Sequence, residues 1–280
     1  MKVSFIMAIA FGVAATCFTP SNSSAQSTAT NYGSLGAAGN GTHTPDVVLD
    51  VPGAVAAGND TGAMYATGAR TGVPFNPAIN PPASSPFTIE LWVLPTASDN
   101  DDTPLNNRQA SGNRSGWTFF QRADGWNFRM YNGAGSGLGW DLTGGTANLF
   151  EWSHIVATWN GSSAVLYVNG ALADNSNDPA ATGVYNPNTA TLAPGLFIGA
   201  NFDGGSASTA TVDEFAFYGS ALTPAQILNH YTLASSPVAG AYHNQVISDG
   251  AIEFLPVPEP ASAWLLASAA AVMVARRRRS

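Results

Sequence analysis

Apolar and polar residues alternate in short runs from about residue 46 to residue 231, and turn residues separate the runs. A period of two is typical of β-strands that bury one face. The pairs Asp124-Gly125 and Asn160-Gly161 predict tight hairpin turns. The clearest predicted strands are residues 86–95, 117–122, 126–131, 154–159, 164–168 and 212–218. Many short strands at regular intervals predict a β-sandwich or barrel.

Helical periodicity is almost absent, with one exception near the end of this region. Thr223 is a favourable N-cap, and Pro224 suits the first helical position. Ile227, Leu228 and Tyr231 would form the apolar side of the helix. The pattern therefore predicts an all-β fold with one short helix near the domain end.

The first 25 residues are typical of a secretory signal peptide. Lys2 precedes an almost unbroken apolar run over residues 3–18, and small polar residues lead to Ala25, after which we expect cleavage. Lipidation of Cys17 is disfavoured because Thr16 stands where a glycine or alanine is preferred. The sequence thus predicts export.

The C-terminus has three successive parts. The motif Pro258, Glu259, Pro260 leads into apolar residues 261–275, and four basic residues follow, namely Arg276, Arg277, Arg278 and Arg279. A helix over the apolar part would rise about 22 Å, less than the roughly 30 Å core of a bilayer. Basic residues stay cytoplasmic, so the domain would lie outside the inner membrane.

This three-part pattern resembles the PEP-CTERM protein-sorting signal. The resemblance implies a transient membrane span that is removed by an exosortase, a transpeptidase-like membrane enzyme of polysaccharide-producing Gram-negative bacteria. A permanent single-span anchor is the alternative. The stretch 234–256 reads as a linker, although 245–247 and 251–254 could form an extra hairpin. The expected segments are a signal peptide 1–25, a flexible lead-in 26–45, a domain 46–233, a linker or hairpin 234–256 and a sorting signal 257–280.

Composition narrows the partners of the exported part. Cys17 is the only cysteine, so the mature chain can form neither disulfides nor thiolate metal sites. Residues 26–258 contain five arginines and 17 carboxylates, a net charge of −12. An acidic chain with no basic stripe argues against nucleic acid and anionic lipid. It is compatible with neutral sugars and calcium.

Several segments, in order, resemble the LamG-like concanavalin A-type lectin/glucanase family. They are FTIELWV (87–93), WSHIVATWNGSSAVLYVNG (152–170), LFIGANFDGG (196–205) and VDEFAFYGSALTPAQILNHY (212–231). The resemblance implies a jelly-roll sandwich of two antiparallel sheets. It also implies that His154 and three tryptophans of these segments, Trp92, Trp152 and Trp159, are structural.

Glucanases of this fold need carboxylates at i, i+2 and i+4 of one strand, on the same face. Glu90 is followed on its face by Trp92 and Leu94, and Glu214 lacks a second carboxylate in the same way. We therefore expect both glutamates to be framework residues and the chain to have no catalytic residues.

Two kinds of binding residue remain. Loop carboxylates are candidate calcium ligands, because calcium prefers clustered oxygen donors; they are Asp99, Asp101, Asp102, Asp174, Asp178 and Asp213. Trp117, Trp126 and Trp140 lie beside glycines, and each could either pack in the core or offer a sugar an exposed ring.

The leading hypothesis is an exported, non-catalytic surface or matrix protein that binds carbohydrate, such as an exopolysaccharide. Signal peptidase and exosortase would process it, with transient insertion in the inner membrane before release to the cell surface. The alternatives are a structural or protein-adhesion module without sugar affinity, and a glycan hydrolase or lyase.

Overall fold

The computed structural model describes residues 27–56, 60–97, 101–109, 112–189 and 195–255. The predicted signal peptide, the motif Pro258–Pro260, the terminal arginines and Asp99 lie outside these residues. Within the described part of the chain, no helix combines the length and apolar character needed to cross a bilayer. The expected span at 261–275 is outside that part.

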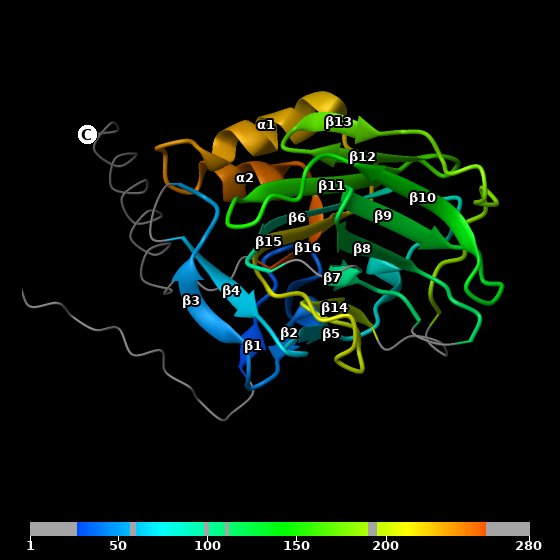
Figure 1. Ribbon diagram of the computed structural model, residues 1–280. Helices are drawn as coiled ribbons and strands as arrows, with labels where there is room; N and C mark the ends of the chain where they lie inside the picture. The colour runs from blue at the N-terminus through cyan, green and yellow to red at the C-terminus, as the bar shows by residue number, and fades with distance from the viewer. Residues whose placement is uncertain (1–26, 57–59, 98–100, 110–111, 190–194, 256–280) are drawn as a thin grey trace, which may run out of the picture.

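The chain forms the expected sandwich of two antiparallel sheets, each with eight strands (Figure 1). Sheet A runs in the order β1 (Thr28–Ala29), β2 (Gly41–His43), β5 (Thr71–Val73), β14 (Leu196–Ile198), β7 (Asp102–Asn106), β8 (Trp117–Arg122), β9 (Gly125–Tyr131) and β10 (Leu138–Gly144). Sheet B runs in the order β13 (Ala171–Asp174), β12 (Ala164–Val168), β11 (Ser153–Trp159), β6 (Phe87–Pro95), β15 (Ala210–Tyr218), β4 (Thr61–Tyr65) and β3 (Val48–Pro52), and β16 (Ala251–Leu255) also pairs with β15. The two predicted hairpins are confirmed as β8–β9 and β11–β12.

The main core fills the space between the sheets with alternate residues of each strand. Phe119 of β8 and Phe128 of β9 are cross-strand partners whose ring centroids lie 4.9 Å apart. Ile89 and Leu91 of β6 face them from the other sheet, fully buried. Burying each such side chain stabilises the fold by about 1.5–3 kcal/mol. The alternation seen in the sequence is therefore the alternation of core and outer faces.

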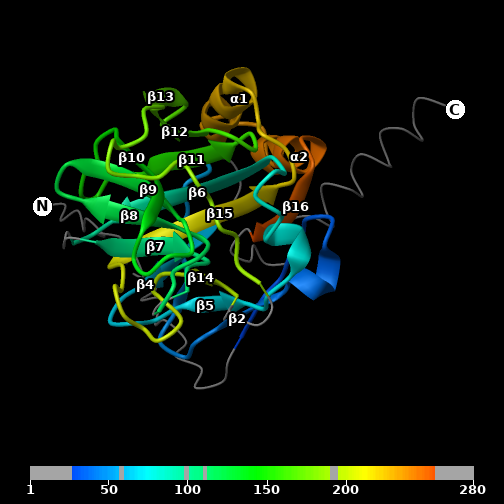
Figure 2. The same ribbon diagram turned by 90° about the vertical axis from the view of Figure 1, so that its right-hand side faces the viewer.

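Two α-helices cover the outer face of sheet B, α1 (Pro224–Ala234) and α2 (Ala241–Ser248), as Figure 2 shows. The expectation of a single helix is therefore wrong. Thr223 caps α1 as predicted, in a reciprocal capping box with Gln226. Ile227 is buried beneath α1, but Leu228 is 52% exposed and so does not belong to the apolar side. The described residues also contain two short 3-10 turns, η1 (Gly36–Gly39) and η2 (Pro77–Ile79).

The domain is longer at both ends than the sequence predicts. The lead-in contains regular structure: β1 and β2 extend sheet A, and the Asn31 side chain donates to Glu253 of β16 at 3.2 Å. The stretch after residue 233 is neither a linker nor a hairpin, since 245–247 belong to α2 and only 251–254 lie in a strand. Local alternation could not reveal this, because β16 pairs with a strand more than thirty residues earlier in the chain.

Candidate functional site

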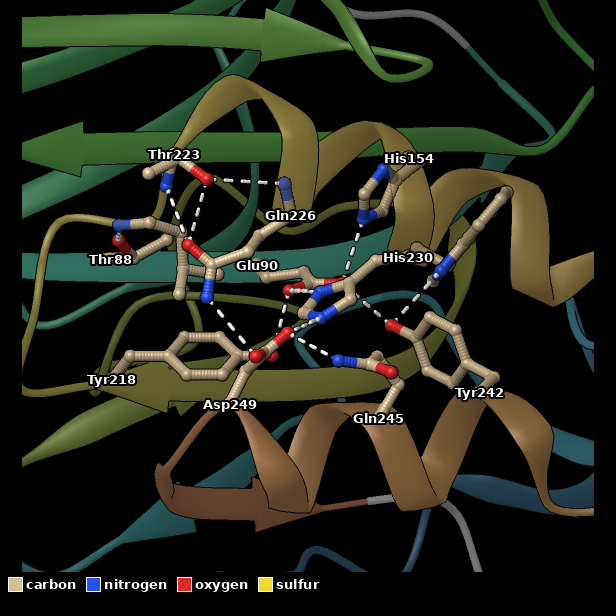
Figure 3. A network of polar contacts seen from close by, with 12 residues as sticks. Thr88, Glu90, His154, Tyr218, Thr223, Gln226, His230, Tyr242, Gln245 and Asp249 are labelled. Atoms are coloured by element: carbon tan, nitrogen blue, oxygen red, sulfur yellow. Dashed lines mark hydrogen bonds and ion pairs between the residues drawn. The ribbon is translucent and has the colours of Figure 1, made fainter.

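Glu90 of β6 is the centre of a buried polar network beneath the two helices (Figure 3). Its carboxylate accepts hydrogen bonds from the hydroxyls of Tyr218 and Tyr242, at 2.9 and 2.8 Å. His154 Nε2 lies 2.8 Å from the same carboxylate, and His230 Nδ1 lies 2.9 Å from it. An ionised carboxylate can only accept hydrogen bonds, so we assign a hydrogen to His154 Nε2 and a hydrogen to His230 Nδ1.

The two buried charges of this network, on Glu90 and His230, are of opposite sign. Burial raises the pKa of Glu90, but the charge on His230 and hydrogen bonds from both histidines outweigh it and hold that pKa well below its usual range. Burial lowers the pKa of His230, and the neighbouring Glu90 and Asp249 carboxylates overcome this and raise it to about 9. His230 is therefore an imidazolium at neutral pH, held between two carboxylates. Its Nε2 lies 2.8 Å from Asp249, which also accepts from Gln226 and Gln245.

The network attaches α1 and α2 to sheet B. His230 comes from α1, Tyr242 and Gln245 from α2, and Glu90 from the sheet. Glu90, His154 and His230 are completely buried, so a substrate atom has no access to this carboxylate. The framework roles predicted for Glu90 and His154 are confirmed by these bonds. Sequence reasoning found no partner for His230, because its two acceptors lie 140 and 19 residues away.

A second cluster of titratable groups lies at β15, between the part of this strand that pairs with β4 and the part that pairs with β16. One oxygen each of Asp60 and Glu214 and one ring nitrogen of His243 lie within 4.8 Å of one another. Asp213 joins them and accepts the Ala54 amide at 2.9 Å. A side chain at Gly53 would collide with the Asp60 and Asp213 carboxylates, so glycine is required there.

The local backbone explains how adjacent acidic residues turn to one place. Glu214 has a φ of +54°, at the point where the pairing of β15 with β6 shifts register between Asp213 and Ala216. Such a bulge redirects side chains that would otherwise alternate between faces. His243 of α2 lies 2.5 Å from Glu214.

The negative charges in this cluster outnumber the positive ones. Burial, followed by repulsion from Glu214 and Asp60, raises the pKa of Asp213 well above its usual value. Burial also raises the pKa of Asp60. Either a proton or a cation can relieve this repulsion. The oxygen donors suit calcium, whereas the imidazole suits manganese or zinc.

The other predicted calcium ligands are dispersed. Asp101 pairs with Arg122 at 2.5 Å, and Asp102 is buried in β7. Asp174 accepts the backbone amides of Thr143 and Ser176, and Asp178 accepts that of Ala180. Of these candidates within the described residues, only Asp213 lies beside the cluster of Asp60, Glu214 and His243. The partners Asp60 and His243 were missed because they lie on distant segments.

Two of the three tryptophans considered as sugar platforms are core residues. Trp117 and Trp126 are 1% and 0% exposed and face the interior, so neither offers a ring to a ligand. The glycines next to them, Gly116 and Gly125, have positive φ values at the strand ends and do not open a platform for a ligand. Trp140 is partly buried against Trp159, and its Nε1 donates to Gly183.

The outer face of sheet A carries a different set of side chains, which we call the outer row. Register brings them side by side across six strands; they are Gly72, Phe197, Asn106, Thr118, Arg129 and Asp141. Phe197 is partly exposed, since both its neighbours in β14, Leu196 and Ile198, turn to the core. With strands about 4.8 Å apart, the outer row is about 24 Å long.

Arginines gather beside this row. Arg108, Arg122 and Arg129 lie over the Phe120 ring, with guanidinium carbons 5.3–5.7 Å from its centroid. Arg114 lies 5.8 Å from the Tyr131 centroid. We call these four residues the arginine face. They are four of the five arginines in residues 26–258, which corrects the expectation of no basic stripe.

With this architecture established, comparison with known proteins identifies the class. The family model described as the concanavalin A-like lectin/glucanases superfamily matches residues 67–228, and the chain belongs to this superfamily. No curated protein matches the sequence.

Solved structures resemble the chain in fold. The HCR/D W1238A mutant is 15% identical, with a TM-score of 0.51, over 74% of this chain and 51% of its own. The Trypanosoma rangeli sialidase bound to the inhibitor DANA is 15% identical, with a TM-score of 0.48, over 71% of this chain and 30% of its own. Domain 4 of the arabinanase AbnA from Geobacillus stearothermophilus, in complex with arabinotriose, is 16% identical, with a TM-score of 0.45, over 73% of this chain and 98% of its own. The chain thus spans about a third of the sialidase and half of the HCR/D chain.

Proposed function

We propose that the chain is an exported, non-catalytic protein that binds carbohydrate on the outer face of sheet A. Membership of a superfamily that includes lectins and glucanases supports a glycan ligand, although fold alone does not decide function. The observation that carries the proposal is the outer row, which has a partly exposed aromatic ring, Phe197, and a partly exposed guanidinium, Arg129, on the same face of the sheet.

This combination suits a sugar. The face of a pyranose ring is apolar and packs on an aromatic ring, while its hydroxyls need planar hydrogen-bonding groups. Phe197 would provide the ring. Its cross-strand neighbour Asn106 is completely buried and donates to the Ala200 carbonyl, so the partly exposed guanidinium of Arg129, in the same row, would provide the hydrogen-bonding group.

The proposal includes the route and the cation that the sequence predicts. A signal peptide over 1–25, exosortase processing at Pro258-Glu259-Pro260 and delivery to the cell surface follow from the sequence patterns. A divalent cation would be held by Asp60, Glu214 and His243, with Asp213 beside them, and it would stabilise the loop at Gly53.

A glycan array with the full chain, with and without divalent cations, tests the proposal. Phe197→Ala should lower the affinity for the glycan that the array identifies at least tenfold, while the melting temperature stays nearly unchanged. Phe150→Ala is the matched control, because this ring is 69% exposed in the β10–β11 connection. Absence of binding across the array would favour an adhesion module, and turnover of a glycan would favour an enzyme.

A further inference from the structure

The arginine face is positively charged, although residues 26–258 as a whole are acidic. Residues 26–258 carry 17 carboxylates and five arginines, yet four of these arginines surround two adjacent aromatic rings on one face of sheet A. The carboxylates that pair with them are Asp101, on Arg122, and Asp141, on Arg129. The face therefore keeps a surplus of two positive charges.

Arg108 and Arg114 hold that surplus. Among the described residues, neither forms an ion pair. Arg108 is also buried, with 8% of its surface exposed. Arg108 Nη1 donates to the Tyr131 hydroxyl at 3.4 Å, while its Nε has no hydrogen-bond partner in the described part of the chain. Because this nitrogen is inaccessible, Arg108 contributes its positive charge to the face, and the partly exposed Arg114 is the guanidinium without an ion-pair partner that a ligand can reach.

The rings arrange the guanidinium groups. Phe120 and Tyr131 are almost completely buried, because the arginines lie over them. A guanidinium stacked on an aromatic ring is planar, fixed and weakly hydrated, and its edge matches the two oxygens of a carboxylate. A ligand that approaches this face therefore meets guanidinium groups before it meets aromatic rings.

We infer that the arginine face binds an acidic polysaccharide through the carboxylates of its uronic acid residues. This inference rests on the proposed carbohydrate-binding function and names the class of its ligand. A sugar ring would pack on Phe197, and a carboxylate of the polymer would pair with Arg114, beside the buried charge of Arg108. The expectation of a neutral glycan, drawn from the net charge, is replaced because the charge is distributed unevenly.

Calorimetry with the full chain tests the inference, using polygalacturonate and the same polymer with its carboxylates reduced to alcohols. Reduction should weaken binding at least tenfold, and raising salt should weaken binding of the acidic polymer, as expected for screened charges. Arg114→Gln combined with Arg122→Gln should lower affinity for polygalacturonate at least tenfold without unfolding the domain. Arg108→Gln should do the same, with thermal unfolding measured in parallel because Arg108 is buried.

Arg70→Gln is the matched control, since Arg70 lies in the β4–β5 connection and donates to Gly68. It removes one positive charge and should change affinity less than twofold. Equal affinity for the two polymers would overturn the inference and leave carbohydrate binding intact. Failure to bind either polymer, or any glycan on an array, would overturn both. Preference for polyuridylate over polygalacturonate would assign the face to nucleic acid and also overturn the inference.

Discussion

The outer faces of the two sheets both carry charged side chains next to aromatic rings, but they differ in how those charges are paired. At sheet B, Glu90 lies beneath two helices and pairs with His230 of α1, which also pairs with Asp249. On sheet A, Arg108 and Arg114 have no carboxylate partner among the described residues. A buried charge with a partner of opposite sign fixes a structure, whereas the unpaired charge of the partly exposed Arg114, beside that of the buried Arg108, can attract a ligand. The difference indicates which face serves stability and which serves binding.

Removal of the charge at the centre of the closed face should have the largest effect. Glu90→Gln leaves the His230 imidazolium without its main partner and places an amide donor against two tyrosine hydroxyls. We expect the free energy of unfolding to fall by roughly 3–5 kcal/mol, as for other broken buried pairs. Urea denaturation measures this.

Glu151→Gln provides the control for that experiment. Glu151 is exposed and accepts from Asn148, so its substitution should change stability by less than about 0.5 kcal/mol. A Glu90→Gln protein as stable as this control would show that the network does not hold the helices to sheet B.

The pH dependence of stability comes next in size. Because the folded protein raises the pKa of His230 to about 9, from 6.5, its contribution is complete below pH 6.5. It is lost as the pH rises toward 9, since the folded state then binds more protons than the unfolded state. We expect a loss of roughly 2–3 kcal/mol between these values.

Denaturation at several pH values, compared with His230→Gln, isolates this term. The variant should be less stable at pH 6 and should show a flatter profile between pH 6.5 and 9. The same slope in both proteins would mean that His230 is not the titrating group.

The acidic cluster sharpens the comparison, because it belongs to sheet B but its charge is not balanced. Asp60→Asn removes one of three crowded carboxylates, so without added metal it should stabilise the protein by about 1 kcal/mol. The same change should abolish any rise in melting temperature caused by calcium, manganese or zinc. Thermal unfolding with each cation measures both effects, and an unchanged metal response would remove Asp60 from the ligand set.

The sequence predicted the elements that depend on local residue patterns. Period-two alternation located β6, β8, β9, β11 and β12, and Thr223 marked the start of α1. It did not reveal β1 or β2, and it offered 251–254 only as half of a hairpin with 245–247, because the true partner of β16 is the distant strand β15.

The candidate sites were harder to predict for the same reason. Glycines beside Trp117 and Trp126 did not report which side of the sheet these rings face, and both face the core. The arginines are spread over residues 108–129 and come together only through strand register and side-chain stacking. Net charge averaged over the chain concealed their concentration.

Hydrogen exchange with and without polygalacturonate tests the central contrast between the two faces most directly. The account predicts that the polymer slows amide exchange in β8 and β9, which carry Arg122 and Arg129, and leaves α1 and α2 unchanged. Protection confined to α1 and α2, or bound polymer without protection in sheet A, would contradict it.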